Sequence, residues 1–219
     1  MTARLDHLVV AAHSLEQGAH WCERVLGVAP APGGRHVAMG THNRLLAIAG
    51  AAFAQAYLEI IAIDPDAAPP SRPRWFGLDD AALQARLRDG PRLLHWVARC
   101  DRLDATLAAL SAQGVDAGAA VAAERAGAHG TYRWRIAGRA DGRLLCGGAL
   151  PTLIEWQDMH PTDHLPPSPV ALQSLALGGI DDAVAANLGL QGVMRTAHGA
   201  ALRARFDTPR GAVQLSSDD

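Results

Sequence analysis

The chain has 219 residues, of which 49% are hydrophobic, and its 20 basic and 22 acidic residues leave a formal net charge of −2. This apolar content supports a sizeable core and excludes wholesale disorder, and the near-neutral charge argues against a dedicated nucleic-acid binder. Every basic residue is Arg and none is Lys, which excludes lysine Schiff-base chemistry.

Neither a targeting segment nor a cysteine framework is evident in the sequence. No apolar run approaches the roughly 20 residues that a membrane-spanning helix needs, and the first residues lack an apolar signal core. The three cysteines, Cys22, Cys100 and Cys146, show no C-x-x-C spacing, so we expect free thiols. We therefore expect a cytoplasmic protein that binds a small molecule, with neither nucleic acid nor membrane as a partner.

Two stretches of the sequence correspond to each other. The segment 5–10 is typical of a strand, and a predicted helix over 14–25 follows it and ends at a Gly-Val pair. The segment 93–98 is typical of another strand, and a predicted helix over 103–112 again ends at a Gly-Val pair. His is the third residue of both strands, as His7 and His95. This pattern indicates an internal duplication.

The ends of the two halves also correspond. Strands are predicted around Glu59 and Glu155, and a Pro follows each Glu after six residues. Shorter strands are predicted between the His strand and the Glu strand of each half, at about 44–49 in the first half and at about 132–137 and 144–147 in the second. Each half therefore reads as a β-α-β-β-β module.

We expect an α+β fold in which paired βαβββ modules form an open, mixed β-barrel or cup. The predicted two-module domain spans residues 1–165 and divides into module one (1–66), a Pro-rich linker (67–91) and module two (92–165). A partial third βαβββ-like unit is predicted over 166–219, with a strand at 172–177, a helix at 181–188 and three further short strands.

Four polar residues carry the predicted chemistry, namely His7, Glu59, His95 and Glu155. Side chains alternate across a strand, so each half offers one His and one Glu to a single face. If the two sheets curl toward each other, these four meet in one cavity. Two imidazoles and two carboxylates suit one divalent ion of Zn, Ni, Co, Mn or Fe. The alternative is that each residue is a buried or exposed polar group with a local partner.

At these residues the chain resembles the vicinal oxygen chelate superfamily, and within it the glyoxalase-like domain group. The resemblance rests on the strand motifs Leu5–Val10, Tyr57–Glu59 and Leu153–Trp156, and on the segments Gly33–His36 and Gly40–Leu46. It implies paired modules around a metal held by His7, Glu59, His95 and Glu155. It further implies that Glu155 is the first candidate for the catalytic base and Glu59 the second.

The resemblance favours a metal-dependent isomerase or lyase that acts by proton transfer on a substrate chelated through vicinal oxygens. An extradiol-type dioxygenase is one alternative, since those members use two His and one Glu on iron. A metal-free protein that binds or sequesters a small molecule is the other. We also consider a homodimer possible.

Further residues are candidates for substrate contact. His36, His42 and Asn43 follow glycines at the entry to a predicted strand, where loops on a rigid sheet often hold binding groups. Tyr57 shares the predicted cavity face with Glu59. His160 and His164 are separated by Pro161, and we expect them in a surface loop.

Overall fold

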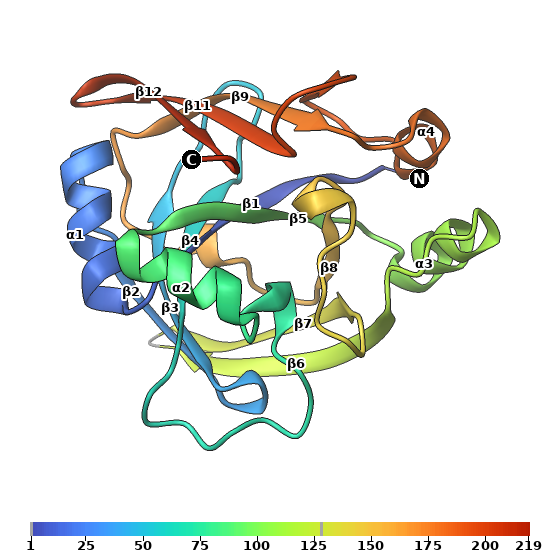
Figure 1. Ribbon diagram of the computed structural model, residues 1–219, viewed down its shortest axis with the longest axis horizontal. Coiled ribbons are helices and arrows are strands. Elements are labelled where there is room, and N and C mark those ends of the chain that lie inside the picture. Colours follow the sequence, from blue (N-terminus) through green and yellow to red (C-terminus); the bar gives the residue numbers. More distant parts are fainter. Residues whose placement is uncertain (1, 128) are drawn as a thin grey trace.

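The computed structural model describes residues 2–127 and 129–219, and it contains two β-sheets with four α-helices packed around them (Figure 1). The larger sheet has eight strands in the order β2-β3-β4-β1-β5-β8-β7-β6, and the smaller has four in the order β10-β9-β11-β12. The larger sheet curls into a nearly closed cup, and the predicted α+β fold of paired βαβββ modules is confirmed.

Module one builds one half of the cup. Its elements are β1 (Arg4–Ala11), α1 (Leu15–Leu26), β2 (Ala31–His36), β3 (Thr41–Ala47) and β4 (Tyr57–Ile63). The last strand, β4, returns to pair in parallel with β1. Ser14 caps α1 by accepting a hydrogen bond from the Gln17 backbone N–H.

Module two repeats the arrangement. Its elements are β5 (Arg92–Arg99), α3 (Leu103–Ala112), β6 (Ala119–Gly127), β7 (Gly130–Gly138) and β8 (Thr152–Trp156). The halves join where β1 and β5 run antiparallel, with His7 opposite Val97 and Val9 opposite His95. The two edge strands of the sheet, β2 and β6, lie against each other. A Cβ added to Gly34 of β2 would lie 2.4 Å from Cδ of Arg125 on β6.

Three local expectations differ from the structure. The strands β2 and β6 have no predicted counterpart, since β2 contains two consecutive glycines and β6 is rich in Ala, a residue depleted in strands. The expected strand at 144–147 is instead a loop with a 3-10 turn at Cys146–Gly148.

The linker between the modules contributes a helix and a wall of the cup. The helix α2 (Ala81–Asp89) is capped by the side chain of Asp80, which accepts from the Leu83 backbone N–H. Before it, the Pro-rich segment 64–80 crosses the side of the cup (Figure 1). Trp75 and Phe76 from this segment pack in the cluster that lines the inside of the cup.

The C-terminal unit has the predicted order of elements but a different strand pairing. It contains β9 (Ala171–Gly178), α4 (Asp182–Leu188), β10 (Val193–Thr196), β11 (Leu202–Thr208) and β12 (Gly211–Ser216). Here β9 pairs with β10 and β11, whereas in each module the first strand pairs with the last. The unit therefore covers the outside of the cup rather than extending it.

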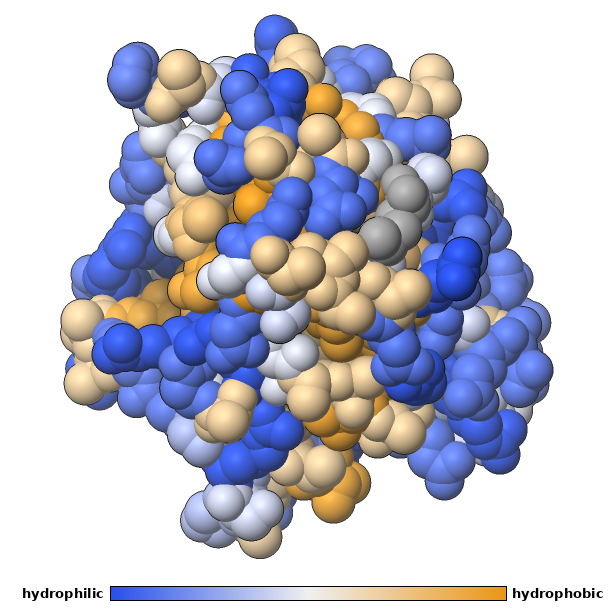
Figure 2. Space-filling model, turned by 90° about the vertical axis from the view of Figure 1, so that its right-hand side faces the viewer, coloured by the Kyte–Doolittle hydropathy of each residue, from blue (hydrophilic) through white to orange (hydrophobic). Residues whose placement is uncertain are grey.

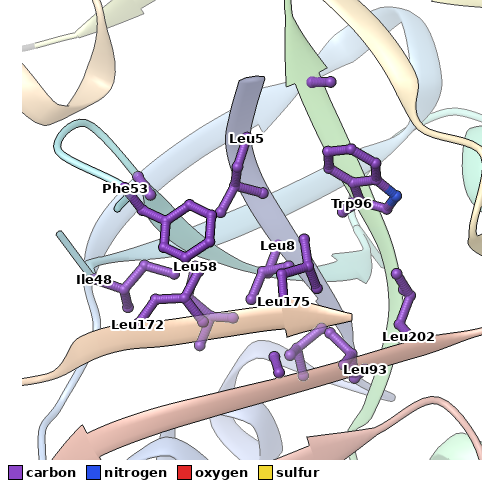
Figure 3. Packing of buried hydrophobic residues seen from close by; sticks show 14 of the residues in the cluster. Leu5, Leu8, Ile48, Phe53, Leu58, Leu93, Trp96, Leu172, Leu175 and Leu202 are labelled. Atoms are coloured by element: carbon purple, nitrogen blue, oxygen red, sulfur yellow. The ribbon is translucent and has the colours of Figure 1, made fainter. Parts of the chain in front are cut away.

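The main hydrophobic core lies between the two sheets. Leu5 and Leu8 of β1 and Leu58 of β4 point toward Leu172 and Leu175 of β9 (Figure 3). All five are almost completely buried. A second cluster lines the inside of the cup, so both faces of β1 are covered and the strand is held in one register.

One face of the molecule mixes hydrophilic and apolar residues. On the side that carries α3 and α4, blue residues surround a band of apolar ones (Figure 2). Among the helices of the described residues, none is long and apolar enough to cross a membrane.

Candidate active site

The inner end of the cup is built on an irregularity in β1. The pairing of β1 with β5 shifts between Leu5 and His7, which marks a β-bulge at Asp6. The bulge lets Asp6 and His7 interact although they are neighbours in a strand. Oδ1 of Asp6 lies 2.7 Å from Nδ1 of His7, and both side chains are buried. Asp6 thus fixes the ring of His7.

Glu59 on β4 faces His7. Its Oε2 lies 3.5 Å from Nε2 of His7, and its Oε1 accepts a hydrogen bond of 2.5 Å from Nδ2 of Asn43. The pairing of β3 with β4 places Asn43 opposite Ile61, and Glu59 is 6% exposed. A line of Asp6, His7 and Glu59 therefore crosses the floor of the cup.

The charges in this line stabilise one another. Burial opposes a charge on His7, but hydrogen bonds to Asp6 and Glu59 outweigh it and raise the pKa of His7 to about 9. Burial also opposes a charge on Glu59, yet hydrogen bonds from His7 and Asn43 hold its pKa below the ordinary value. At neutral pH the line therefore contains an imidazolium between two carboxylates.

Asp6 is also bound from module two. Nε2 of His160 lies 3.0 Å from its Oδ2, and Nε1 of Trp156 donates to the same oxygen at 2.9 Å. Burial would raise the pKa of Asp6, but these contacts and that of His7 hold it well below its usual value. His160 is therefore a buried partner of the site, in contrast to the surface position expected from the sequence.

Three of the four predicted substrate contacts line a small cavity of about 40 Å³ beside the His7–Glu59 pair. His36, Asn43 and Tyr57 are among its walls. The Tyr57 ring stacks on His7 at 4.5 Å, and burial lowers the pKa of His36 to about 4, so His36 is neutral. His42 does not line this cavity, because alternation along β3 turns it away from Asn43, toward Asp64 at 3.9 Å.

His95 faces the cup but stands apart from this group. Its Nδ1 lies 3.0 Å from the carbonyl oxygen of Gly148, and its Nε2 accepts from the Thr152 backbone N–H at 3.1 Å. Burial lowers the pKa of His95 to about 3. Both nitrogens of the neutral His95 ring thus have hydrogen-bond partners, Gly148 and Thr152, and neither has a lone pair free toward His7.

Glu155 lies on the opposite face of the sheet, which corrects the expected convergence of the four residues. In β8 it is Ile154 and Trp156 that face the cup, while Leu153 packs in the core between the sheets. Oε1 of Glu155 accepts from the Leu103 backbone N–H at the start of α3, where no other side chain caps the helix. Oε2 pairs with Arg135 at 3.2 Å.

These positions bear on the expected metal ion. A divalent ion needs its donors around one point, and the predicted quartet is divided, with His95 engaged by hydrogen bonds and Glu155 on the outer face. Across residues 2–127 and 129–219, no group of three or more His, Cys, Asp or Glu has the arrangement to hold a metal ion. The predicted ligand set therefore does not fit a single divalent ion.

A large cavity leads to the small one. Its volume is about 1000 Å³, and its walls come from β2, β6, β7 and the linker. The two cavities share His36, Trp75, Phe76, Arg125, Trp134 and Ile136 as lining residues. The two cavities are therefore neighbours, and His7 and Glu59 line the small one.

The sequence contains weak signals for the residues that were missed. Asp6 forms a polar pair with His7 inside an apolar strand, which is unusual unless both groups are satisfied. Trp156 alternates with Glu155, and the alternation alone does not say which of the two faces the cup. The role of His160 depends on a contact across 154 residues, for which the local sequence offers no sign.

Comparison with known proteins agrees with this architecture. The family model described as "Glyoxalase-like domain" matches residues 5–207. A solved hypothetical protein from Staphylococcus aureus is similar, with a TM-score of 0.59 and 12% identity over 99% of this chain and 86% of its own. Comparison with curated proteins gives no match.

Solved methylmalonyl-CoA epimerases are more distant. The Streptomyces coelicolor enzyme in complex with 2-nitronate-propionyl-CoA has a TM-score of 0.45 at 20% identity, over 71% of this chain and 98% of its own. The Mycobacterium tuberculosis enzyme has a TM-score of 0.40 at 20% identity, over 71% and 87%. Because the family model spans nearly all of both modules and most of the C-terminal unit, this chain belongs to the glyoxalase-like domain family.

Proposed function

We propose that this chain is a glyoxalase-like enzyme that moves a proton at a carbon atom next to a carbonyl group, in a reaction of the isomerase or lyase type. The observation that carries the proposal is the buried line of Asp6, His7 and Glu59, whose last two members line the small cavity that shares walls with the cavity of about 1000 Å³. Paired acidic and basic groups with displaced pKa values are typical of proton-transfer sites.

Glu59 is the base in this proposal. Its carboxylate takes the proton from the substrate carbon, and the electron pair of the broken C–H bond moves onto the carbonyl oxygen to give an enolate. Once Glu59 is protonated it no longer pairs with the Nε2–H of His7, and this N–H donates a hydrogen bond to the enolate oxygen and stabilises its charge. For a 2-hydroxycarbonyl substrate, the hydroxyl proton moves to the enolate oxygen and Glu59 returns its proton to the former carbonyl carbon, which completes an isomerisation. General base catalysis of this kind typically contributes about 10²- to 10⁴-fold.

The surrounding residues position these two. Asp6 holds the His7 ring and keeps it protonated, and Asn43 fixes one oxygen of Glu59 so that the other faces the cavity. The apolar rings of Tyr57, Trp75 and Phe76 keep water away from the inner end. Low water content strengthens the electrostatic effect of His7 on a developing oxyanion.

No step is assigned to a metal ion, because the predicted donors do not converge. Chelation of the substrate through vicinal oxygens, and the iron chemistry of a dioxygenase, would both require His95 to release Gly148 and Thr152. Elemental analysis of the wild type and of His95→Gln tests this point. Equal metal content per chain is expected, whereas an ion lost only from the variant would restore His95 as a ligand.

A second function is supported by the size and apolar lining of the large cavity, namely binding of a small molecule without chemistry. The two functions differ in one observable, the exchange of a substrate C–H proton with solvent. Incubation of the protein in D₂O with a panel of 2-hydroxycarbonyl, 2-oxo and 2-substituted acyl compounds, followed by NMR, measures it.

Deuterium uptake at the carbon next to the carbonyl, catalysed by the wild type and lost in Glu59→Gln, is the result expected of the enzyme. A compound that binds both proteins equally and exchanges in neither would instead support a binding protein. Replacement of exposed Asp207 by Asn, on β11 and away from the cup, serves as the matched control for loss of one carboxylate.

A further inference from the structure

Two side chains of the linker carry buried hydrogen-bond donors that nothing satisfies. Within residues 2–127 and 129–219, Nε of Arg72 and Nε1 of Trp75 are buried and lack a hydrogen-bond partner. Buried donors in proteins are almost always paired, because an unpaired one loses its hydrogen bond to water without gaining another. Both residues also line the large cavity. A ligand in the cavity would therefore lie against the two side chains whose donors are unsatisfied.

The two donors differ in their distance from the reacting end. Nη2 of Arg72 donates to the carbonyl oxygen of Arg139 at 2.6 Å, just past the end of β7, and this contact anchors the guanidinium at that end of the cavity. Trp75 packs edge-on against His36 at 5.0 Å and lines the small cavity as well. Of the two residues, Trp75 therefore lies nearer to His7 and Glu59, and Arg72 lies farther away.

The charged residues of the cavity wall favour an anionic ligand. Its lining includes six Arg and one Glu among the described residues, and that Glu, Glu124, is paired with Arg133 at 3.2 Å. Arg35 and Arg139 are paired with Asp side chains. The remaining three, Arg72, Arg125 and Arg143, have no carboxylate partner in the described part of the chain. The cavity is thus apolar in its walls and positive at the edges.

We propose that the linker selects the substrate, and that the substrate is an elongated organic anion with an apolar body. Arg72 pairs with its anionic group through the guanidinium, which has no carboxylate partner among the described residues and lines the cavity. Trp75 donates its indole N–H to an oxygen closer to the reacting carbon. Trp134 and Ile136 contact the apolar middle. The inference names the substrate class of the proton-transfer site and in that sense rests on the proposed function.

Binding measurements test this without turnover. Isothermal titration at fixed ionic strength compares octyl phosphate, below its micelle concentration, with 1-octanol and with inorganic phosphate. The wild type is expected to bind octyl phosphate at least about tenfold more tightly than either fragment-like probe, because charge-assisted hydrogen bonds and apolar burial act together.

Two variants assign the donors. Arg72→Met keeps the apolar stem but is expected to lose most of the preference for octyl phosphate over octanol, while Arg72→Lys retains part of it. Trp75→Phe keeps the ring and is expected to weaken octyl phosphate binding about threefold to tenfold. Arg205→Met, an exposed residue of β11, controls for the loss of one positive charge and is expected to bind like the wild type.

Equal affinity of the wild type for octanol and octyl phosphate would overturn the inference, and so would an unchanged preference in Arg72→Met with a wild-type melting temperature. If proton exchange fails but the anion preference holds, the proposed reaction falls and the ligand class stands. If exchange succeeds without any anion preference, the proposed reaction stands and the ligand class is wrong.

Discussion

Oδ1 of Asp6 lies 2.7 Å from Nδ1 of His7, the next residue along the same strand, and both side chains are buried. Neighbours in a regular strand point to opposite faces. The bulge in β1 removes that constraint, so Asp6 can hold the ring of His7 in one orientation and keep it protonated. Among the described residues, His7 is the only histidine that forms an ion pair with Glu59. The candidate active site depends on this irregularity more than on any single side chain.

Replacing Asp6 by Asn tests the relationship. Asn cannot balance the charge of His7, so we expect the pKa of His7 to fall from about 9 toward its ordinary value. Proton-exchange activity should drop by about tenfold or more, with the loss greatest at high pH, where His7 is no longer protonated. NMR titration of the His7 ring, together with a pH–activity profile, measures both effects.

The same change at Asp207, which is exposed, should leave the titration of His7 and the pH profile as in the wild type. An Asp6→Asn variant whose His7 still titrates near 9 would show that Glu59 alone sets the protonation of the ring.

Gly33 leaves space for the side chain that orients Glu59. A Cβ at this position would lie 2.1 Å from Oδ1 of Asn43 and 2.6 Å from its backbone oxygen. Because a backbone atom cannot easily move aside, we expect Gly33→Ala to destabilise the fold by about 1–3 kcal/mol and to reduce activity by displacing Asn43. Chemical denaturation and the exchange assay measure the two losses. Gly90→Ala, where a Cβ meets nothing within 4 Å, should be neutral.

Buried neutral histidines should make the protein sensitive to acid. The pKa values of His36 and His95 fall to about 4 and about 3 in the folded chain, from an ordinary value of 6.5. Below pH 6.5 these two histidines bind protons in the unfolded chain but not in the folded chain, so the free energy of unfolding decreases as the pH falls. The two groups together add a slope of up to about 2.7 kcal/mol per pH unit.

His7 acts with the opposite sign. Its raised pKa stabilises the fold fully below pH 6.5, and this contribution is lost as the pH rises through about 9. Free energies of unfolding measured from pH 4.5 to 9.5 should therefore peak between these limits. His95→Gln should halve the acid slope, whereas the exposed His20→Gln should not change it. An acid slope unaffected by His95→Gln would mean that its ring is protonated in the folded chain.

Much of the fold could be predicted from the sequence because the duplicated His strands, helices and Glu strands are strongly patterned. The strand β6 could not, since Ala and Gly dominate it and it is held by pairing with β7 rather than by its own propensity. The C-terminal unit has the predicted elements, but its strand order depends on packing against Leu5 and Leu8, which a local pattern does not encode.

The site was only half predictable for the same reason. His7, Glu59, Asn43 and Tyr57 share a face because β1, β3 and β4 are paired in register. Glu155 was expected beside them, yet alternation in β8 is compatible with either face. The choice is made by Trp156, whose indole reaches Asp6, and by the open start of α3, which Glu155 caps.

The central claim is that Glu59, and not Glu155, moves the proton. The most direct test is the rate of deuterium uptake by the compound that the wild type exchanges, measured for Glu59→Gln and Glu155→Gln side by side. We predict a loss of about 10²-fold or more for Glu59→Gln, and a rate close to that of the wild type for Glu155→Gln. Loss of exchange in Glu155→Gln, with exchange retained in Glu59→Gln, would contradict the account.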